Sequence, residues 1–241
     1  MKNFSTLSGG PRTRVLAAVF ASALAFSGCK KDDAPPEPVG NANVMFVHAA
    51  TNASDIDVYV GQVRQPSPLA SLSNTGYVSV EAGNKKVELN EASKLTPYTT
   101  VNQDFRKNAH YSVFAFNRIP SVESLVVIDS LDKTTTAAGR AFVRLIHLAP
   151  DAPNVSVALA DNGTIRQTVI PNTKYKAYSA FREIPAGSTS LALVKEDLTA
   201  AYVTPSAQNF VANRFYTLVA QGFVNGKDKE ALTVRVIENV K

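Results

Sequence analysis

The sequence predicts an all-β chain of two tandem antiparallel β-sandwich domains of immunoglobulin-like class. The first observation is an internal repeat, because residues 143–159, VRLIHLAPDAPNVSVAL, follow the pattern of residues 44–60, VMFVHAATNASDIDVYV. The second is a series of short segments with period-2 alternation, separated by turn residues at roughly ten-residue intervals. The third is a leader that ends at the single cysteine of the chain. The two domains are therefore expected to follow a cleaved signal peptide.

Length and composition fit this organisation. The chain has 241 residues, of which 45% are hydrophobic and 19% charged, as in a globular protein. This length allows one large domain or two small ones, and the internal repeat favours two. We expect the first sandwich at residues 43–133 and the second at residues 140–241.

The charge and the cysteine count exclude several classes of function. The formal net charge is +5, but Lys2, Arg12 and Arg14 belong to the leader that precedes Cys29. The chain after the leader has 22 basic and 20 acidic residues. A balance so near neutral argues against a nucleic-acid partner. Because Cys29 is the only cysteine, an internal disulfide and a thiolate metal site downstream are also excluded.

Residues 1–28 have the pattern of a signal peptide, with a basic start, an apolar run at 15–26 and small residues before Cys29. The run of about twelve residues is shorter than the roughly 20 that a membrane-spanning helix needs. Residues 26–29, FSGC, resemble a bacterial lipobox, although Phe26 replaces the usual aliphatic residue. This resemblance implies a lipoprotein that is cut before Cys29 and acylated there, with palmitate among the chains. The alternative is an ordinary signal peptide with an unmodified cysteine.

Residues 29–42 are expected to hold the lipidated cysteine and a proline-rich tether. The sequence KKDD at 30–33 resembles the export signal of surface-exposed lipoproteins in one large phylum of Gram-negative bacteria. It implies a lipid-anchored location at the outer membrane, exposed at the cell surface. A solvated charged spacer is the alternative. Residues 34–38, APPEP, favour an extended conformation.

Alternation places the strands of the first copy. Val44, Phe46 and His48 share one face of a strand at 44–48, and a second strand with one wet face follows at 56–60. Further strands are expected at 77–81, 85–90, 97–102, 110–117 and 124–130. The second copy keeps this order. Tyr111 and Tyr216 open the penultimate strand of their copies, the place of a tyrosine corner.

The segment HLAPDAP at 147–153, between its two strands, resembles the opening signature of a bacterial extracellular family, domain of unknown function 4397. Ala186-Gly187 and FYT at 215–217 are also similar to the family pattern. The first copy matches it less closely, since Thr51 and Ser54 replace the two prolines. The resemblance covers nearly all of the mature chain. It implies a secreted or surface-attached protein and carries no activity.

His48 and His147 are the first candidates for chemistry. Each ends a strand in phase with the apolar face, so we expect its ring to bond the following turn. A metal site normally needs three or four protein ligands, and each copy offers too few. The alternative is a metal-dependent or acid/base hydrolase that uses His48 and His147, with Asp151 beside His147.

Carboxylates supply the remaining candidates. Asp151 is expected to bond its own backbone in a rigid PDAP turn that sets the register of the flanking strands. Asp55, Asp57 and Asp161 could bind calcium weakly, but the closely spaced oxygen ligands of a dedicated site are missing. We therefore predict no catalytic residue, no metal and no cofactor. Ser130, in DSL at 129–131, resembles the acceptor of periplasmic O-glycosylation in the same phylum.

These observations favour a non-catalytic outer-membrane lipoprotein whose tandem sandwiches serve binding, adhesion or structure. Its partners would be the membrane, through the lipid anchor, and a protein or glycan ligand. The hydrolase described above is one alternative. An accessory subunit of a surface uptake complex is another.

Overall fold

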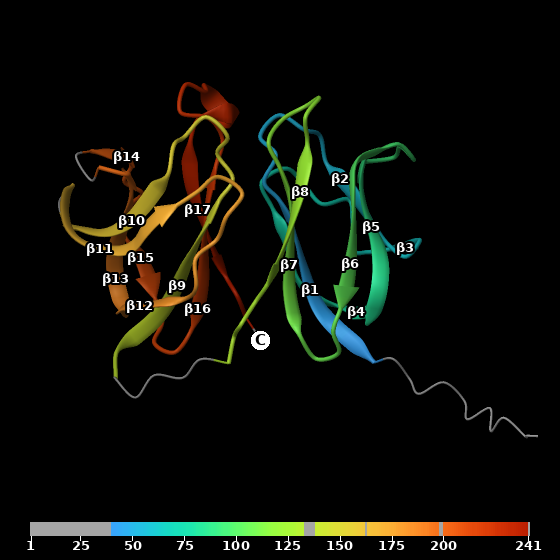
Figure 1. Ribbon diagram of the computed structural model, residues 1–241, viewed down its shortest axis with the longest axis horizontal. Helices are drawn as coiled ribbons and strands as arrows, with labels where there is room; N and C mark the ends of the chain where they lie inside the picture. Colours follow the sequence, from blue (N-terminus) through green and yellow to red (C-terminus); the bar gives the residue numbers. More distant parts are fainter. Residues whose placement is uncertain (1–39, 133–137, 162, 198–199, 241) are drawn as a thin grey trace, which may run out of the picture. The chain divides into compact units, whose positions relative to one another are not determined.

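The computed structural model describes residues 40–132, 138–161, 163–197 and 200–240 (Figure 1). These residues fall into one compact unit. The expected signal peptide, Cys29 and most of the tether lie outside them. Within the described part, no helix combines the length and the apolar character that a membrane crossing requires.

The first sandwich consists of two four-stranded sheets, with strand orders β4-β1-β7-β8 and β3-β2-β5-β6. Its strands are β1 (Asn41–His48), β2 (Ile56–Val60), β3 (Val63–Arg64), β4 (Asn74–Glu81), β5 (Gly83–Glu91), β6 (Pro97–Phe105), β7 (His110–Phe116) and β8 (Glu123–Ile128). Alternate residues of these strands, such as Val44, Phe46, Val58 and Leu89, fill the space between the sheets. The period-2 pattern of the sequence therefore marks the faces of the strands correctly.

The second sandwich repeats this arrangement. Its sheets have the orders β12-β9-β16-β17 and β11-β10-β13-β14, with β15 also paired to β13. The strands are β9 (Arg140–His147), β10 (Val155–Asp161), β11 (Thr164–Thr173), β12 (Arg182–Pro185), β13 (Gly187–Lys195), β14 (Ala201–Val203), β15 (Gln208–Phe210), β16 (Phe215–Gln221) and β17 (Thr233–Glu238). A single 3-10 turn, η1 (Asp228–Glu230), is the only helical element among the described residues.

The prediction of an all-β sandwich fold is confirmed, but the immunoglobulin-like strand order is wrong. An immunoglobulin sandwich keeps its first two strands in one sheet. Here β1 and β2 lie in different sheets, and β1 runs parallel to β7, as β9 does to β16. The two sheets that contain β1 and β9 are therefore mixed, whereas the other sheet of each sandwich is purely antiparallel. Alternation reveals which face of a strand is buried and does not identify the neighbouring strand.

The tyrosine corners are confirmed in both sandwiches. The Tyr111 hydroxyl accepts a hydrogen bond from the backbone N–H of Arg106 at 3.1 Å. The Tyr216 hydroxyl accepts one from the N–H of Val211 at 2.9 Å. Each hydroxyl thus satisfies a backbone donor at the strand connection, which a phenylalanine could not do.

The sheets that contain β1 and β9 are buried on both faces. Met45 and Val47 point away from the first core and join Ile146, Val219 and other residues of the second sandwich in a third apolar cluster. We call this cluster the shared core. Antiparallel sheets commonly keep one face in water, so burial of both faces sets these two sheets apart. The shared core makes the two sandwiches neighbours in one packed unit.

Five polar side chains form a closed ring of hydrogen bonds beside the shared core. Arg144 donates to Asp129, and its Nε donates to the Thr217 hydroxyl at 2.9 Å. Thr217 donates to Asn239 at 2.7 Å, and Asn239 donates to the Tyr77 hydroxyl at 2.9 Å. Tyr77 closes the ring by donating to Asp129 at 2.5 Å. Tyr77 and Asp129 belong to the first sandwich, so the ring joins the two.

The Arg144–Asp129 ion pair, one link of this ring, is removed from water. The side chains are only 2% and 0% exposed. Asp129 accepts a further hydrogen bond from Ser112 at 2.7 Å, and the guanidinium of Arg144 lies 4.8 Å from the centre of the Phe181 ring. A buried ion pair with this many partners is costly to break from one side, because the remaining charge stays in a dry environment.

Replacing Arg144 with alanine is therefore expected to reduce the free energy of unfolding by about 3–5 kcal/mol, since the Asp129 carboxylate would lose its cation. Urea unfolding followed by circular dichroism measures this change. The matched control is Arg166→Ala, because the Arg166–Asp161 pair is 59% and 61% exposed. Its expected loss is below about 1 kcal/mol. Equal losses in the two variants would contradict the role given to Arg144.

Candidate functional site

His48 and His147 occupy the same place in their sandwiches, at the ends of β1 and β9, and both are fully buried. The Nε2 of His48 lies 3.0 Å from the Ser54 carbonyl oxygen, and the Nε2 of His147 lies 3.1 Å from that of Pro153. Each ring thus ties the end of a strand to the loop that leads into the next sheet. This geometry agrees with the structural role expected from the sequence.

The contacts determine the protonation state of the rings. A carbonyl oxygen only accepts, so Nε2 must carry the proton in both histidines. In His147 the Nδ1 atom accepts from the backbone N–H of Ala149 at 3.3 Å, which fixes the neutral tautomer. Burial away from water is the main cause that lowers the pKa of both His48 and His147 below 6.5.

The carboxylate of Asp151 bonds to backbone groups of another loop, so the acid/base pair that the alternative hydrolase hypothesis requires does not form. The Asp151 carboxylate accepts from the backbone N–H groups of Val224 at 2.8 Å and Asn225 at 3.4 Å. The expectation that Asp151 bonds its own turn was wrong. Short side-chain bonds to the local backbone are common for aspartate, but here the loop after β16 offers free donors. Asp151 thus joins two loops of the second sandwich.

The candidates for calcium binding also have other partners. Asp57 pairs with Arg64 at 2.6 Å, and Asp161 pairs with Arg166 at 3.0 Å. Asp55 accepts from the backbone N–H of Ser71 at 3.3 Å. No group of three or more His, Cys, Asp or Glu side chains in the described ranges is arranged to hold a metal ion.

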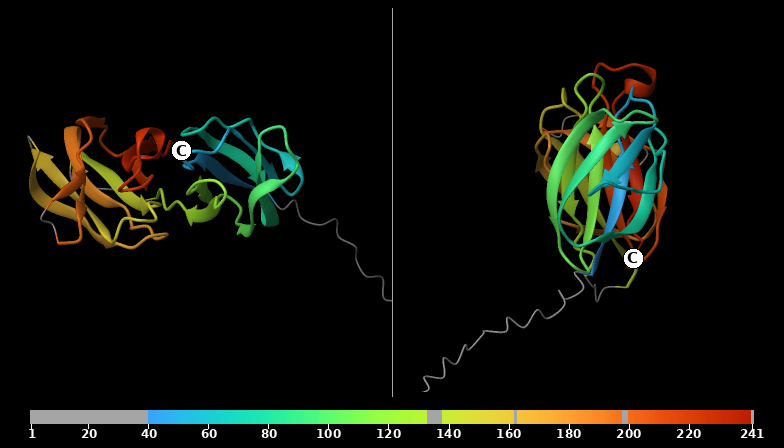
Figure 2. Two further views of the ribbon diagram at one scale, coloured as in Figure 1. Left: turned by 90° about the horizontal axis from the view of Figure 1, so that it is seen from above. Right: turned by 90° about the vertical axis from the view of Figure 1, so that its right-hand side faces the viewer.

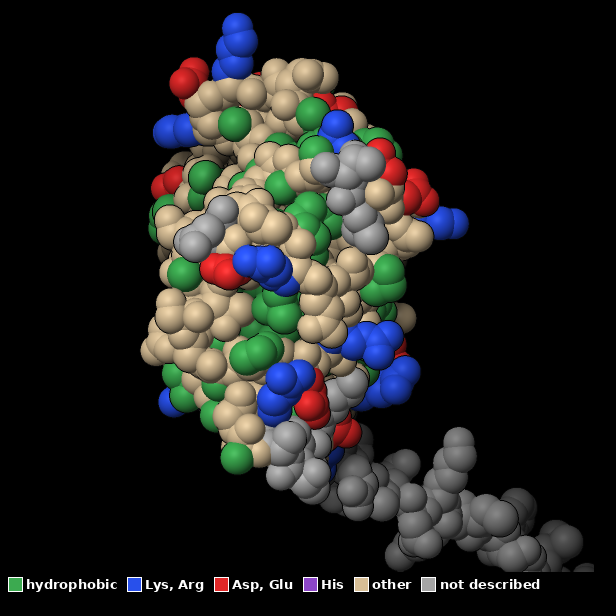
Figure 3. Space-filling model, turned by 90° about the vertical axis from the view of Figure 1, so that its left-hand side faces the viewer, with side chains coloured by type: hydrophobic (Ala, Val, Ile, Leu, Met, Phe, Trp, Pro, Cys, Tyr) green, Lys and Arg blue, Asp and Glu red, His purple; other side chains and the backbone are tan. Residues whose placement is uncertain are grey.

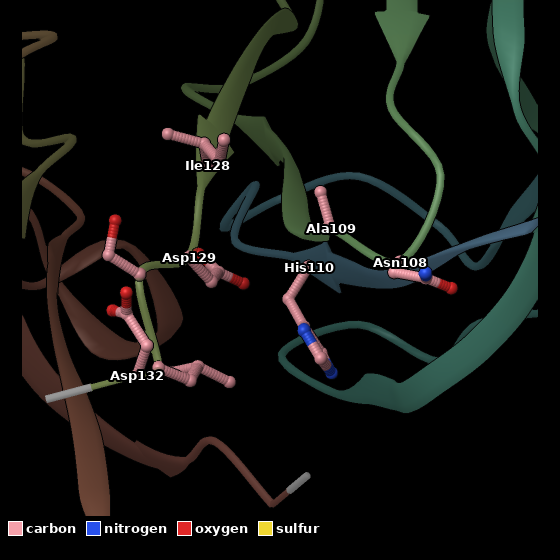
Figure 4. A pocket seen from close by; sticks show the side chains of 8 residues that line it. Asn108, Ala109, His110, Ile128, Asp129 and Asp132 are labelled. Carbon is pink, nitrogen blue, oxygen red and sulfur yellow. The ribbon is translucent and has the colours of Figure 1, made fainter.

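A pocket of about 350 Å³ opens where β8 ends, and Figure 4 shows His110 and Asp132 on its walls. Ser130 lines this pocket and is exposed, whereas Asp129 and Leu131 on either side of it are buried. An enzyme acting on the folded chain would reach the Ser130 hydroxyl but not the two flanking side chains of the expected acceptor motif. Cys29, the expected lipidation site, lies outside the described residues.

Sequence reasoning placed a solvent-exposed face on the strand at 56–60 but did not extend it to a polar surface of the first sandwich. The outward residues of the sheet β3-β2-β5-β6 include Tyr59, Arg64, Lys86 and Glu88, which face away from the core that Val58, Val60 and Val87 enter. Alternation within 85–90 could also have found Lys86 and Glu88. Arg64 lies on a two-residue strand, which carries no detectable period.

Comparisons with known proteins give one family and one structural likeness. The sequence model of a family described as "Domain of unknown function (DUF4397)" matches residues 31–158, which span the first sandwich and reach into β10 of the second. A search of curated proteins finds no match. Among solved structures, the chain is similar to CBMbc (family CBM26) from Eubacterium rectale Amy13K, crystallised with maltoheptaose. The sequence identity is 7% and the TM-score 0.26, with 83% of this chain and 98% of that chain covered.

The buried histidines predict a loss of stability in mild acid. Their folded pKa values lie below the unfolded value of about 6.5, so the unfolded chain takes up protons first as the pH falls. The stabilisation from neutral His48 and His147 is complete above pH 6.5 and declines below it, by up to about 1.4 kcal/mol per pH unit for each histidine.

Urea unfolding between pH 7.5 and pH 5.5 measures this slope. His147→Gln is expected to make it shallower, because glutamine retains an N–H donor for the Pro153 carbonyl and does not titrate. A free energy of unfolding that stays constant or rises as the pH falls through this range would contradict the assignment of two buried neutral imidazoles.

Proposed function

The chain belongs to the family described as domain of unknown function DUF4397, and on this premise we propose that it is a non-catalytic lipoprotein of the bacterial outer membrane, whose paired sandwiches form a surface-displayed binding module. The observation that carries the proposal is the use of its reactive side chains. His48, His147 and Asp151 all bond to the backbone of neighbouring loops. The two histidine rings are fully buried, and the Asp151 carboxylate already accepts from two backbone N–H groups, so these side chains hold the shape of the module and are not placed to take a proton from a substrate.

We also propose that the two sandwiches, at residues 43–133 and 140–241, arose by duplication of one module. The two halves share a strand order that includes the parallel central pair, and each has a buried histidine and a tyrosine corner in the same place. Two independent origins would have to converge on all of these features. Duplication explains them together.

The proposed anchor is the acylated Cys29. Each buried CH₂ group of an acyl chain contributes about 0.8 kcal/mol of membrane affinity, so several chains on one residue hold a protein stably. The proline-rich residues 34–38 would then separate the module from the lipid surface. The proposal that the module is displayed outside the cell rests on the resemblance of the charged residues 30–33 to an export signal of surface lipoproteins.

The anchor proposal is tested with the full chain and its Cys29→Ala variant in intact cells. We expect radiolabelled palmitate in the wild type alone, recovery of the wild type in the outer-membrane fraction and release of the variant. Protease added outside the cells should cleave the wild-type chain. A chain that is unlabelled, or that resists external protease while a known surface protein is cut, would contradict the anchor or the display respectively.

We propose Ser130 as a glycosylation site as well, since its hydroxyl is exposed at the rim of the pocket beside β8. Because the flanking Asp129 and Leu131 are buried, an enzyme that reads all three residues would act before the chain folds. Mass spectrometry of the chain from its own host should show a sugar mass on the peptide with Ser130, absent in Ser130→Ala. An unmodified wild-type peptide would contradict the proposal.

A further inference from the structure

The outer face of the sheet β3-β2-β5-β6 carries an ordered set of polar side chains. Cross-strand pairing places Arg64, Tyr59, Glu88 and Thr100 in one row, because Tyr59 lies opposite both Arg64 and Glu88, and Glu88 lies opposite Thr100. Directly opposite residues on one face have Cβ atoms about 5 Å apart. Figure 2, right, shows this sheet toward the viewer with no described segment across it.

The charged groups of this face are held in place by ion pairs. The buried Asp57 carboxylate binds Arg64 at 2.6 Å and accepts from the Ser93 backbone N–H at 3.0 Å. Lys86 and Glu88 are 2.7 Å apart. Arg64 and Lys86 each have a carboxylate partner, and Asp104 adds a further carboxylate, because its partner Asn84 is in phase with Lys86 and Glu88 on this face. The face therefore carries a small excess of negative charge. It presents donors and acceptors at fixed positions and does not attract an anionic polymer.

The second sandwich serves as an internal comparison. In the equivalent register, Ala158 lies opposite Ala192, and these take the places of Tyr59 and Glu88. Ala158, Ala192 and Val194 form a small buried apolar cluster there, with Ala160 and Ile165 packed against it. Figure 3 views this side of the second sandwich and shows hydrophobic side chains along its middle. The two sandwiches have equivalent cores and the same strand order, but they differ on this outer face. The fold does not require the polar set, since the second sandwich forms without it.

We propose that the outer face around Tyr59, Arg64, Lys86 and Glu88 binds a neutral oligosaccharide. The proposal rests on the binding function proposed above and names its ligand class and its site. Sugar hydroxyl groups donate and accept at once, so a guanidinium, an ammonium and a carboxylate at fixed spacing suit pairs of them. The half-buried Tyr59 ring offers an apolar surface with a polar tip beside them, suited to the C–H face of a sugar ring. The small excess of negative charge on this face favours neutral over acidic sugars.

The test uses the full mature chain on an array of neutral glucans, mannans and galactans, with sialylated and sulfated oligosaccharides as charged probes. Titration calorimetry with the neutral oligosaccharide retained most strongly then gives its dissociation constant. Tyr59→Ala is expected to weaken binding about tenfold, and Lys86→Ala, at a half-exposed position, tests the site with little risk to folding. Tyr178→Ala is the matched control, since this tyrosine of the second sandwich is 45% exposed.

Loss of binding in Tyr59→Ala and Lys86→Ala, with Tyr178→Ala unchanged and all melting temperatures alike, would support the proposal. Neutral binding that both changes leave intact would overturn the site while the binding function stands. Retention of charged oligosaccharides alone would overturn the ligand class. Retention of none, with a protein partner recovered by crosslinking on intact cells, would overturn this inference without overturning the binding module.

Discussion

Burial of one sheet of each sandwich on both faces is the constraint on which the rest of the structure depends. Val44 and Phe46 enter the first core, while Met45 and Val47, between them on β1, enter the shared core. A strand that is dry on both sides has no free face for a binding site. The shared core therefore leaves the outer sheets and the loops as the surfaces on which a ligand could bind.

The hydrogen-bonded ring around Arg144 follows from the same constraint. A sheet that is covered on both faces must satisfy any charged residue inside the structure, and burying a charge alone is very costly. Arg144 meets this requirement with Asp129, Thr217 and the Ile128 carbonyl oxygen. Because Asp129 belongs to the first sandwich and Arg144 to the second, the ring fixes how the two sheets meet. Apolar contacts alone are non-directional and would fix it less well.

The sequence predicted the local features of the fold and not its long-range contacts. The strand faces, the tyrosine corners and the role of the histidines follow from residues close in the chain, such as Tyr111 and the nearby N–H of Arg106. The strand order does not, because β1 pairs with β7 far along the sequence. The near-continuous apolar runs at 44–50 and 141–149 did carry a signal, since such runs indicate burial on both faces. In the second run this signal is harder to recognise, because the charged Arg144 interrupts the apolar residues. The partners of Arg144 come from distant segments, as do those of Asp151.

The central claim is that the two sandwiches fold as one unit through the shared core. Differential scanning calorimetry of the mature chain tests it most directly, because a two-state transition has equal calorimetric and van't Hoff enthalpies. The account predicts one transition with a ratio of these enthalpies close to one. Two separate transitions, or a calorimetric enthalpy near twice the van't Hoff value, would show that each sandwich unfolds alone and would contradict it.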